Sequence, residues 1–94
     1  MELGEMLGKI AEKYLERDKK SGDLFLLAVL VEEVGELAEA VRKRDLEDIE
    51  EELADVCFMV FSLANLFSLG ERLERKIIEK YIEGDPSERW DFRD

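Results

Sequence analysis

Two pairs of acidic residues in the middle of the chain have the types and the spacing that a metal site requires. Glu33 and Glu36 stand three apart in one segment, and Glu52 and Asp55 stand three apart in a second. Residues three apart on a helix are neighbours on its surface, so two antiparallel helices could bring four carboxylates together. Carboxylates that lie so close repel one another unless a cation is bound between them. We therefore predict a divalent metal site made of oxygen ligands, which suits Mg²⁺ or Mn²⁺.

Glu52 is the most informative of these acids because it interrupts an apolar pattern. It lies three residues after Ile49 and four before Val56, so helical geometry places it within the face that is expected to be buried. Asp55 lies at the edge of the same face. Burying an unpaired charge is very costly, so a carboxylate at this position needs a cation or a proton. A lysine or arginine partner in the core is the alternative.

Four helices are expected to position the acids. Apolar stripes of helical period predict helices over about residues 2–19, 24–43, 46–68 and 71–83, followed by an irregular tail over 85–94. Gly22 lies just beyond the first helix, and Asp23 and Asp45 are plausible N-caps of the next two. The short connection before the third helix implies an antiparallel hairpin. We therefore expect a single all-α domain over residues 1–94 that resembles a four-helix bundle.

The first two turns of the second predicted helix, residues 24–31, are apolar on every side. A helix that is hydrophobic all round is buried all round. In a chain of 94 residues, such burial indicates a partner subunit, and we expect a homodimer or a homotetramer. Cys57 follows in a later apolar run, where we expect it to be a small buried hydrophobic residue.

The amino-acid composition limits the kinds of ligand and partner that the protein can bind. The formal charge of −11 speaks against a nucleic acid polymer, which requires a basic face, although a bound divalent ion would still allow a small phosphorylated ligand. The chain has no histidine, which excludes histidine-based catalysis and histidine-ligated zinc or iron. The longest nearly apolar stretch, residues 56–69, is too short to span a bilayer. The single cysteine cannot form an internal disulfide, so we expect a cytoplasmic protein without a membrane partner.

The segments Glu32–Leu37 and Glu51–Val56 together resemble the paired motif of the MazG-like nucleotide pyrophosphohydrolases, which belong to the all-α NTP pyrophosphatase superfamily. The resemblance implies that Glu33, Glu36, Glu52 and Asp55 hold Mg²⁺, with Glu32 beside them as a supporting residue or helper base. It also implies that a nucleoside triphosphate is hydrolysed to the monophosphate and pyrophosphate, with nucleotide-pool housecleaning as one role.

The resemblance further implies that basic residues of the fourth helix bind the phosphates of the substrate. Lys76 and Lys80 match that spacing, and Arg75 is an alternative. An exposed helix face without a ligand is an equally simple interpretation of these lysines.

Three other interpretations remain open at this point. The related phosphoribosyl-ATP pyrophosphohydrolases share the fold and the acid pattern, but the basic residues expected before the first acid pair are absent from residues 26–31. A di-iron carboxylate bundle would need Glu-x-x-His motifs, which a chain without histidine lacks. A non-catalytic helical dimer acting as an interaction module would explain the apolar turns but not Glu52.

Overall fold

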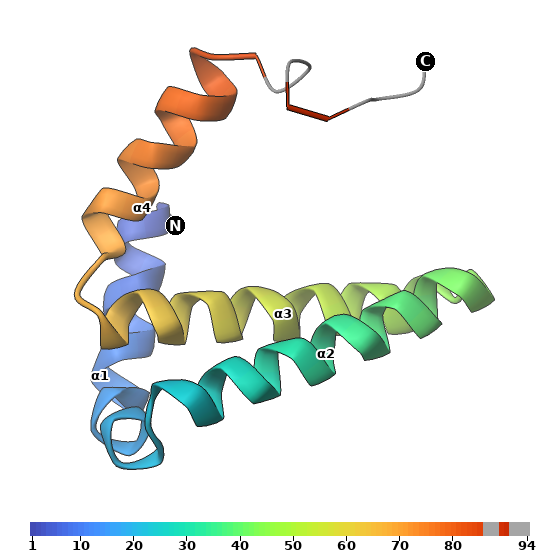
Figure 1. The fold of residues 1–94 in the computed structure, drawn as a ribbon, viewed down its shortest axis with the longest axis horizontal. Coiled ribbons are helices and arrows are strands. Elements are labelled where there is room, and N and C mark those ends of the chain that lie inside the picture. The colour runs from blue at the N-terminus through green and yellow to red at the C-terminus, as the bar shows by residue number, and fades with distance from the viewer. Residues whose placement is uncertain (86–88, 91–94) are drawn as a thin grey trace.

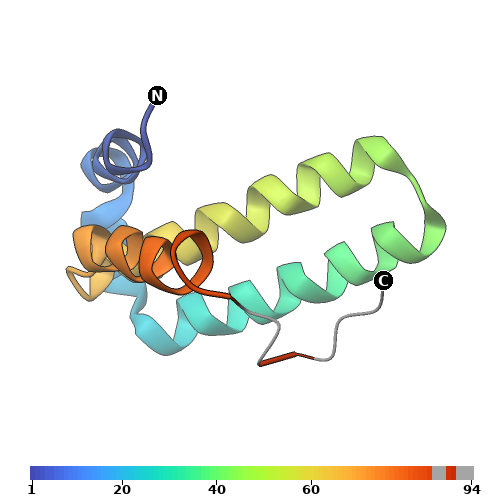
Figure 2. The same cartoon turned by 90° about the horizontal axis from the view of Figure 1, so that it is seen from above.

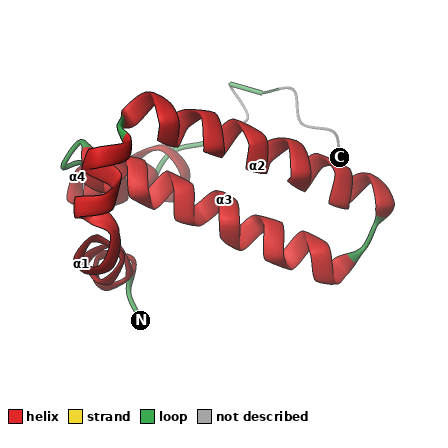
Figure 3. Cartoon of the chain, turned by 90° about the horizontal axis from the view of Figure 1, so that it is seen from below, coloured by secondary structure: helices red, strands yellow, loops and turns green. Residues whose placement is uncertain are grey.

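The computed structural model describes residues 1–85 and 89–90, and the regular elements within these ranges are all helices. Figure 1 shows their arrangement, and Figure 3 shows helices and loops but no strand in the described part. The elements are α1 (Leu3–Ser21), α2 (Asp23–Lys43), α3 (Leu46–Leu66), α4 (Gly70–Ile77) and a π-helical continuation of α4, η1 (Ile78–Ile82). The prediction of an all-α chain is confirmed. Most of the predicted irregular tail, residues 86–88 and 91–94, lies outside the described residues.

The boundaries of the first three helices follow from residues at their ends. Gly22 ends α1 with φ 92°, a conformation that side chains disfavour, and its backbone N–H donates to the Asp18 carbonyl. The same glycine precedes α2, so the prediction of Asp23 as N-cap is wrong: Asp23 is already the first residue of the helix. The prediction for Asp45 is confirmed, because its side chain accepts from the Asp48 backbone N–H at 3.2 Å.

The helices α2 and α3 form an antiparallel hairpin, as predicted. They run side by side in both views of the ribbon and are joined by Arg44 and Asp45, with Arg44 in the left-handed conformation at φ 56°. Residues on the facing sides of the two helices are therefore held opposite one another. This hairpin fixes the relative positions of the two acidic pairs.

The helix α1 crosses one end of the hairpin and packs mainly against α3 (Figure 1). Asn65 helps to hold this crossing, because its side-chain Nδ2 donates to the Leu7 carbonyl of α1 at 3.0 Å. After α3 the chain turns sharply, with Ser68 at φ 56°, and α4 leaves at the same end of the hairpin. The opposite end, where Arg44 lies, thus projects away from α1 and α4.

The apolar residues of α2 are only partly buried within one chain. Leu26 is buried, whereas Leu24, Phe25 and Val31 are 77%, 58% and 64% exposed. The all-round burial that the sequence predicts for residues 24–31 is therefore not supplied by this chain alone. Cys57 is also exposed, so its predicted burial is wrong for the single chain.

The described helices include none that is both long enough and apolar enough to cross a membrane.

Candidate metal centre

Three carboxylates from two helices converge on one spot of the hairpin. Glu33 and Glu36 come from α2 and Glu52 comes from α3. Each offers one carboxylate oxygen, and these oxygens all lie within 4.8 Å of one another. Because α2 and α3 are antiparallel neighbours, a pair spaced by three on one helix meets its counterpart on the other. We call these three residues the acidic cluster.

The acidic cluster contains buried oxygen atoms that lack a partner. Glu33 and Glu52 are half-buried, and the Oε2 atom of each is buried without a hydrogen bond to any described residue. Glu36 is exposed. A buried acceptor without a partner costs about 1–3 kcal/mol, and more when it is charged. The cluster thus has acceptor atoms that a cation could satisfy, and one side through which a ligand can enter.

Two carboxyl groups of the acidic cluster, Glu33 and Glu52, have raised pKa values. The pKa of Glu33 rises to about 7, first because a protonated Glu33 shares a hydrogen bond with the Glu52 carboxyl group and then because of burial. The negative charges of Glu36, Glu52 and Asp55 raise it further. Burial also raises the pKa of Glu52, an effect that the hydrogen bond to Glu33 opposes. A proton on this pair therefore reduces the repulsion between the carboxylates, as a bound cation would.

The remaining predicted site residues lie outside this group of three. Asp55 is exposed, and it is close enough for its charge to raise the pKa of both Glu33 and Glu52. Glu32 is exposed on α2. Metal binding by Asp55 and a proton-accepting role for Glu32 stay predictions.

The two predicted phosphate-binding lysines lie beyond α3 in the chain. Lys76, on α4, forms an ion pair with Glu79 at 3.2 Å. Lys80, in η1, lies over the ring of Tyr81, with Nζ 5.4 Å from the ring centroid. Neither lysine belongs to the acidic cluster, so their contact with a substrate stays a prediction.

The donor set of the acidic cluster fits a hard divalent cation. It consists of carboxylate oxygens on two packed helices, with no nitrogen or sulfur ligand. Mg²⁺ takes such ligands and keeps several of its waters, so three or four carboxylates are enough to hold it. The two buried Oε2 atoms without partners are the feature that a bound cation would explain.

A family model described as the MazG nucleotide pyrophosphohydrolase domain matches residues 21–88. The chain belongs to this family. The match covers α2, α3, α4 and η1, and so includes every acidic residue of the predicted MazG site. It leaves out nearly all of α1. Among curated proteins, none matches the chain significantly.

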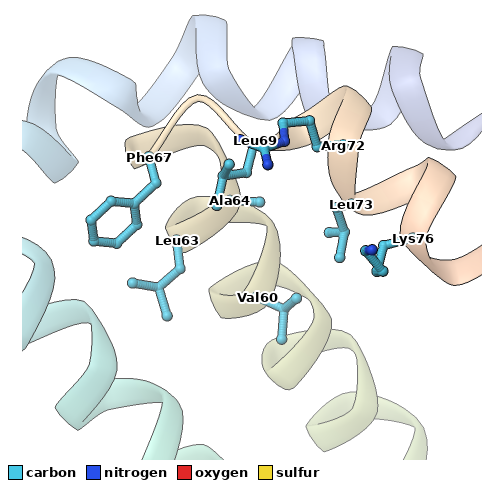
Figure 4. A pocket seen from close by; sticks show the side chains of 8 residues that line it. All are labelled: Val60, Leu63, Ala64, Phe67, Leu69, Arg72, Leu73 and Lys76. Carbon is cyan, nitrogen blue, oxygen red and sulfur yellow. The ribbon is translucent and has the colours of Figure 1, made fainter.

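The MazG domain has an apolar pocket that the sequence patterns did not indicate. It lies at the bend between α3 and α4 and has a volume of about 390 Å³. Figure 4 shows apolar side chains of α3 on one side, including Val60 and Leu63, and Leu73 and Lys76 of α4 on the other. Lys76 thus lines this pocket. Only the bend between α3 and α4 creates the pocket, so helical periodicity could not have revealed it.

Proposed function

We propose that this MazG domain hydrolyses nucleoside triphosphates to nucleoside monophosphates and pyrophosphate in a metal-dependent reaction. The observation that supports the proposal is the acidic cluster, whose three oxygens lie within 4.8 Å and whose Glu33 and Glu52 each keep a buried oxygen without a partner. Mg²⁺ is the proposed cation, and Mn²⁺ is the alternative. Housecleaning of the cytoplasmic nucleotide pool is the role that we propose for this activity.

The proposed mechanism uses few groups because phosphoryl transfer needs charge neutralisation and positioning more than covalent catalysis. When bound, the cation would neutralise charge on the phosphates and lower the pKa of the attacking water. Glu33, Glu36 and Glu52 would hold the cation, and Asp55 would complete the set. Glu32 takes the proton from the water.

The bonds of the reaction balance without a further reactant. Water attacks the α-phosphorus, the bond from this phosphorus to the bridging oxygen of the β-phosphate breaks, and pyrophosphate leaves. Lys76 and Lys80 are the proposed contacts for the phosphates, because a lysine ammonium is a compact positive charge.

Exchanging Glu52 for glutamine is expected to remove the activity. Glu52→Gln keeps the shape of the side chain but loses the charge that holds the cation, so we expect pyrophosphate release to fall by at least about a hundredfold. Release is measured from a panel of ordinary and modified nucleoside triphosphates with Mg²⁺, with Mn²⁺ and with a chelator. Helical content is followed by circular dichroism and should not change.

Glu50→Gln is the matched control, because Glu50 is an exposed glutamate two residues earlier on α3. It should retain wild-type activity. Full activity in Glu52→Gln would refute the metal-site assignment. If no nucleotide is hydrolysed and metal does not raise the melting temperature, the chain is instead a non-catalytic helical module.

A further inference from the structure

A second cavity lies beside the acidic cluster, where α1, α2 and α3 meet. It has a volume of about 270 Å³, and its lining includes Val29 of α2 and Met59 of α3. Val29 stands four residues before Glu33, and Met59 stands four residues after Asp55. Because the two helices are antiparallel, both offsets lead along the hairpin in the same direction, toward α1. Four residues of helix correspond to about 6 Å along its axis. The cavity is therefore about one helical turn from the acidic cluster, along the same groove of the hairpin.

Asp18 of α1 lines this cavity and is only 1% exposed. Its neighbour Arg17 donates two hydrogen bonds to Asp18 Oδ1, from Nε at 3.1 Å and from Nη2 at 2.8 Å. Both of these hydrogen bonds go to Oδ1, and no described residue donates a hydrogen bond to Oδ2. An ionised carboxylate is an acceptor only, with about two acceptor sites on each oxygen. Oδ2 therefore remains able to accept from a ligand in the cavity.

Arg17 is held in place by aromatic rings. Its guanidinium carbon lies 4.7 Å from the centroid of the Tyr14 ring, within the range of a cation–π interaction. The Tyr14 ring in turn meets the Phe58 ring edge to face, with the centroids 5.1 Å apart. Arg17 thus stays on Oδ1 and orients the Asp18 carboxylate, which makes it a positioning residue.

The lining of the cavity includes two aromatic side chains, and its volume suits one aromatic ring system. Phe58 of α3 and Phe25 of α2 both line it, and Phe25 is 58% exposed. Nucleobases stack on aromatic side chains whatever their identity. Pockets for whole drug-sized ligands have volumes of about 300–1,000 Å³, so a cavity of about 270 Å³ fits a base better than an entire nucleotide.

We propose that this cavity binds the base of the nucleotide and that Asp18 selects guanine. The inference rests on the proposed hydrolysis of nucleotides and names its substrate class. A sugar separates the base of a nucleotide from its first phosphate, which agrees with a base cavity one turn away from the acidic cluster.

The selection follows from the donors on the Watson–Crick edge of each base. Guanine presents two adjacent donors, the ring N1–H and the 2-amino group, which can converge on Asp18 Oδ2. Adenine and cytosine place an acceptor next to their amino group, and uracil and thymine place carbonyl groups on both sides of a single N–H. An acceptor held against a carboxylate is repulsive, so Asp18 favours guanine and disfavours the other bases.

Asp18 and Arg17 lie before residue 21, where the match to the MazG family model begins. Guanine selection would therefore be a property of α1 in this chain, added to the part that carries the acidic cluster.

The first test compares kcat/KM for GTP, ITP, ATP, CTP and UTP. Inosine lacks the 2-amino group of guanine, so wild type should prefer GTP to ITP by about tenfold. Asp18→Asn should lower kcat/KM for GTP by about 10-fold to 100-fold, the effect of one hydrogen bond to a charged group. The other nucleotides should change less. Glu16→Gln is the matched control, because it removes the same charge from an exposed side chain of α1 and should leave the base preference unchanged.

The second test measures binding without catalysis. GMP, IMP and AMP are titrated with a chelator present and followed by NMR chemical shifts. GMP should bind most tightly to wild type, and Asp18→Asn should lose this preference. Phe25→Ala, which alters an exposed side chain and is not expected to unfold the protein, should weaken all three without changing their order. If Asp18→Asn does not fold, wild type alone tests the proposal: tighter binding of GMP than of IMP supports guanine selection, and equal binding overturns it.

The outcomes separate the base pocket from the proposed reaction. Guanine binding that depends on Asp18, without hydrolysis of any nucleotide, supports the pocket and refutes the reaction. Hydrolysis with equal rates for all bases, or a base preference that Asp18→Asn leaves intact, overturns the pocket and leaves the reaction standing.

Discussion

At the scale of single residues, the proposed chemistry of this protein depends on carboxylates in unlike surroundings. Glu33 and Glu52 have acidic neighbours and raised pKa values, Glu33 first through its hydrogen bond to Glu52 and Glu52 first through burial. Asp18 is more deeply buried, but it has Arg17 as its cationic partner. The first arrangement attracts a cation because negative charge is in excess, whereas the second leaves one oxygen for a neutral donor. We therefore expect similar side chains to bind different ligands, because their surroundings differ.

The stability of the metal-free protein is expected to fall as the pH rises from about 4.5 to about 7. Glu33 has a pKa of about 7 in the folded protein, against an ordinary value of 4.5. Between these values the folded state binds more protons than the unfolded state, so the free energy of unfolding decreases with increasing pH. The stabilisation by the proton on Glu33 is fully present below pH 4.5 and is lost as the pH rises through 7. Thermal unfolding of wild type with a chelator measures it.

Glu33→Gln is the reference for this measurement, because glutamine stays neutral throughout. The melting temperature of this variant should depend less on pH than that of wild type. Saturating Mg²⁺ should replace the proton and raise the melting temperature of wild type at pH 8. Equal pH dependence in the two proteins would contradict the raised pKa.

At the scale of elements, the α2–α3 hairpin holds the acidic cluster and α1 is attached across one end of it. The contact that Asn65 makes with Leu7 joins residues 58 positions apart in the chain. Leu7 itself is buried. This crossing keeps the cavity of Asp18 next to the groove of the hairpin.

Asn65→Ala is expected to destabilise the protein by about 1–3 kcal/mol. It removes a partly buried hydrogen bond and leaves the Leu7 carbonyl without this donor. Urea unfolding followed by circular dichroism measures the change. Glu50→Ala, at an exposed position of the same helix, should change stability by less than about 0.5 kcal/mol. Equal effects of the two substitutions would show that the contact does not hold α1 in place.

Much of this arrangement could be predicted from the sequence, because helical periodicity is a local property. The helices, the antiparallel hairpin and the half-buried position of Glu52 all follow from spacing and caps. The cavity of Asp18 does not, since Asp18 stands in the charged run Glu16–Lys20 and resembles an exposed residue. Its burial depends on how α1 crosses the hairpin. The exposure of Cys57 has the same origin, because a pattern marks a residue as apolar but does not supply the surface that covers it.

At the scale of the whole molecule, the single chain is more extended than its size requires. Its radius of gyration is 14.9 Å, whereas about 12 Å is typical of a compact domain of this length. The hairpin projects beyond the other helices (Figure 2), and the chain bends sharply between α3 and α4 (Figure 1). Together with the exposed apolar side chains of α2, this shape supports the proposal of a homodimer or a homotetramer.

Leu24→Glu is expected to weaken this association. Leu24 is 77% exposed, so a charge there costs little within one chain but disrupts an apolar interface. Light scattering after gel filtration should give a multiple of 10.9 kDa for wild type and a lower mass for the variant. Leu46→Glu is the matched control: Leu46 is 80% exposed in the first turn of α3, at the projecting end of the hairpin. A monomeric wild type would refute the proposal.

The crossing of α1 over the hairpin also bears on how a protein of this family could change over evolutionary time. The acidic cluster belongs to α2 and α3, and the residue proposed to choose the base belongs to α1. Substitutions on α1 could then alter which nucleotide is accepted while the phosphate chemistry continues unchanged. A protein engineer could use the same separation and vary residues 14–21 as a library without altering a carboxylate of the cluster.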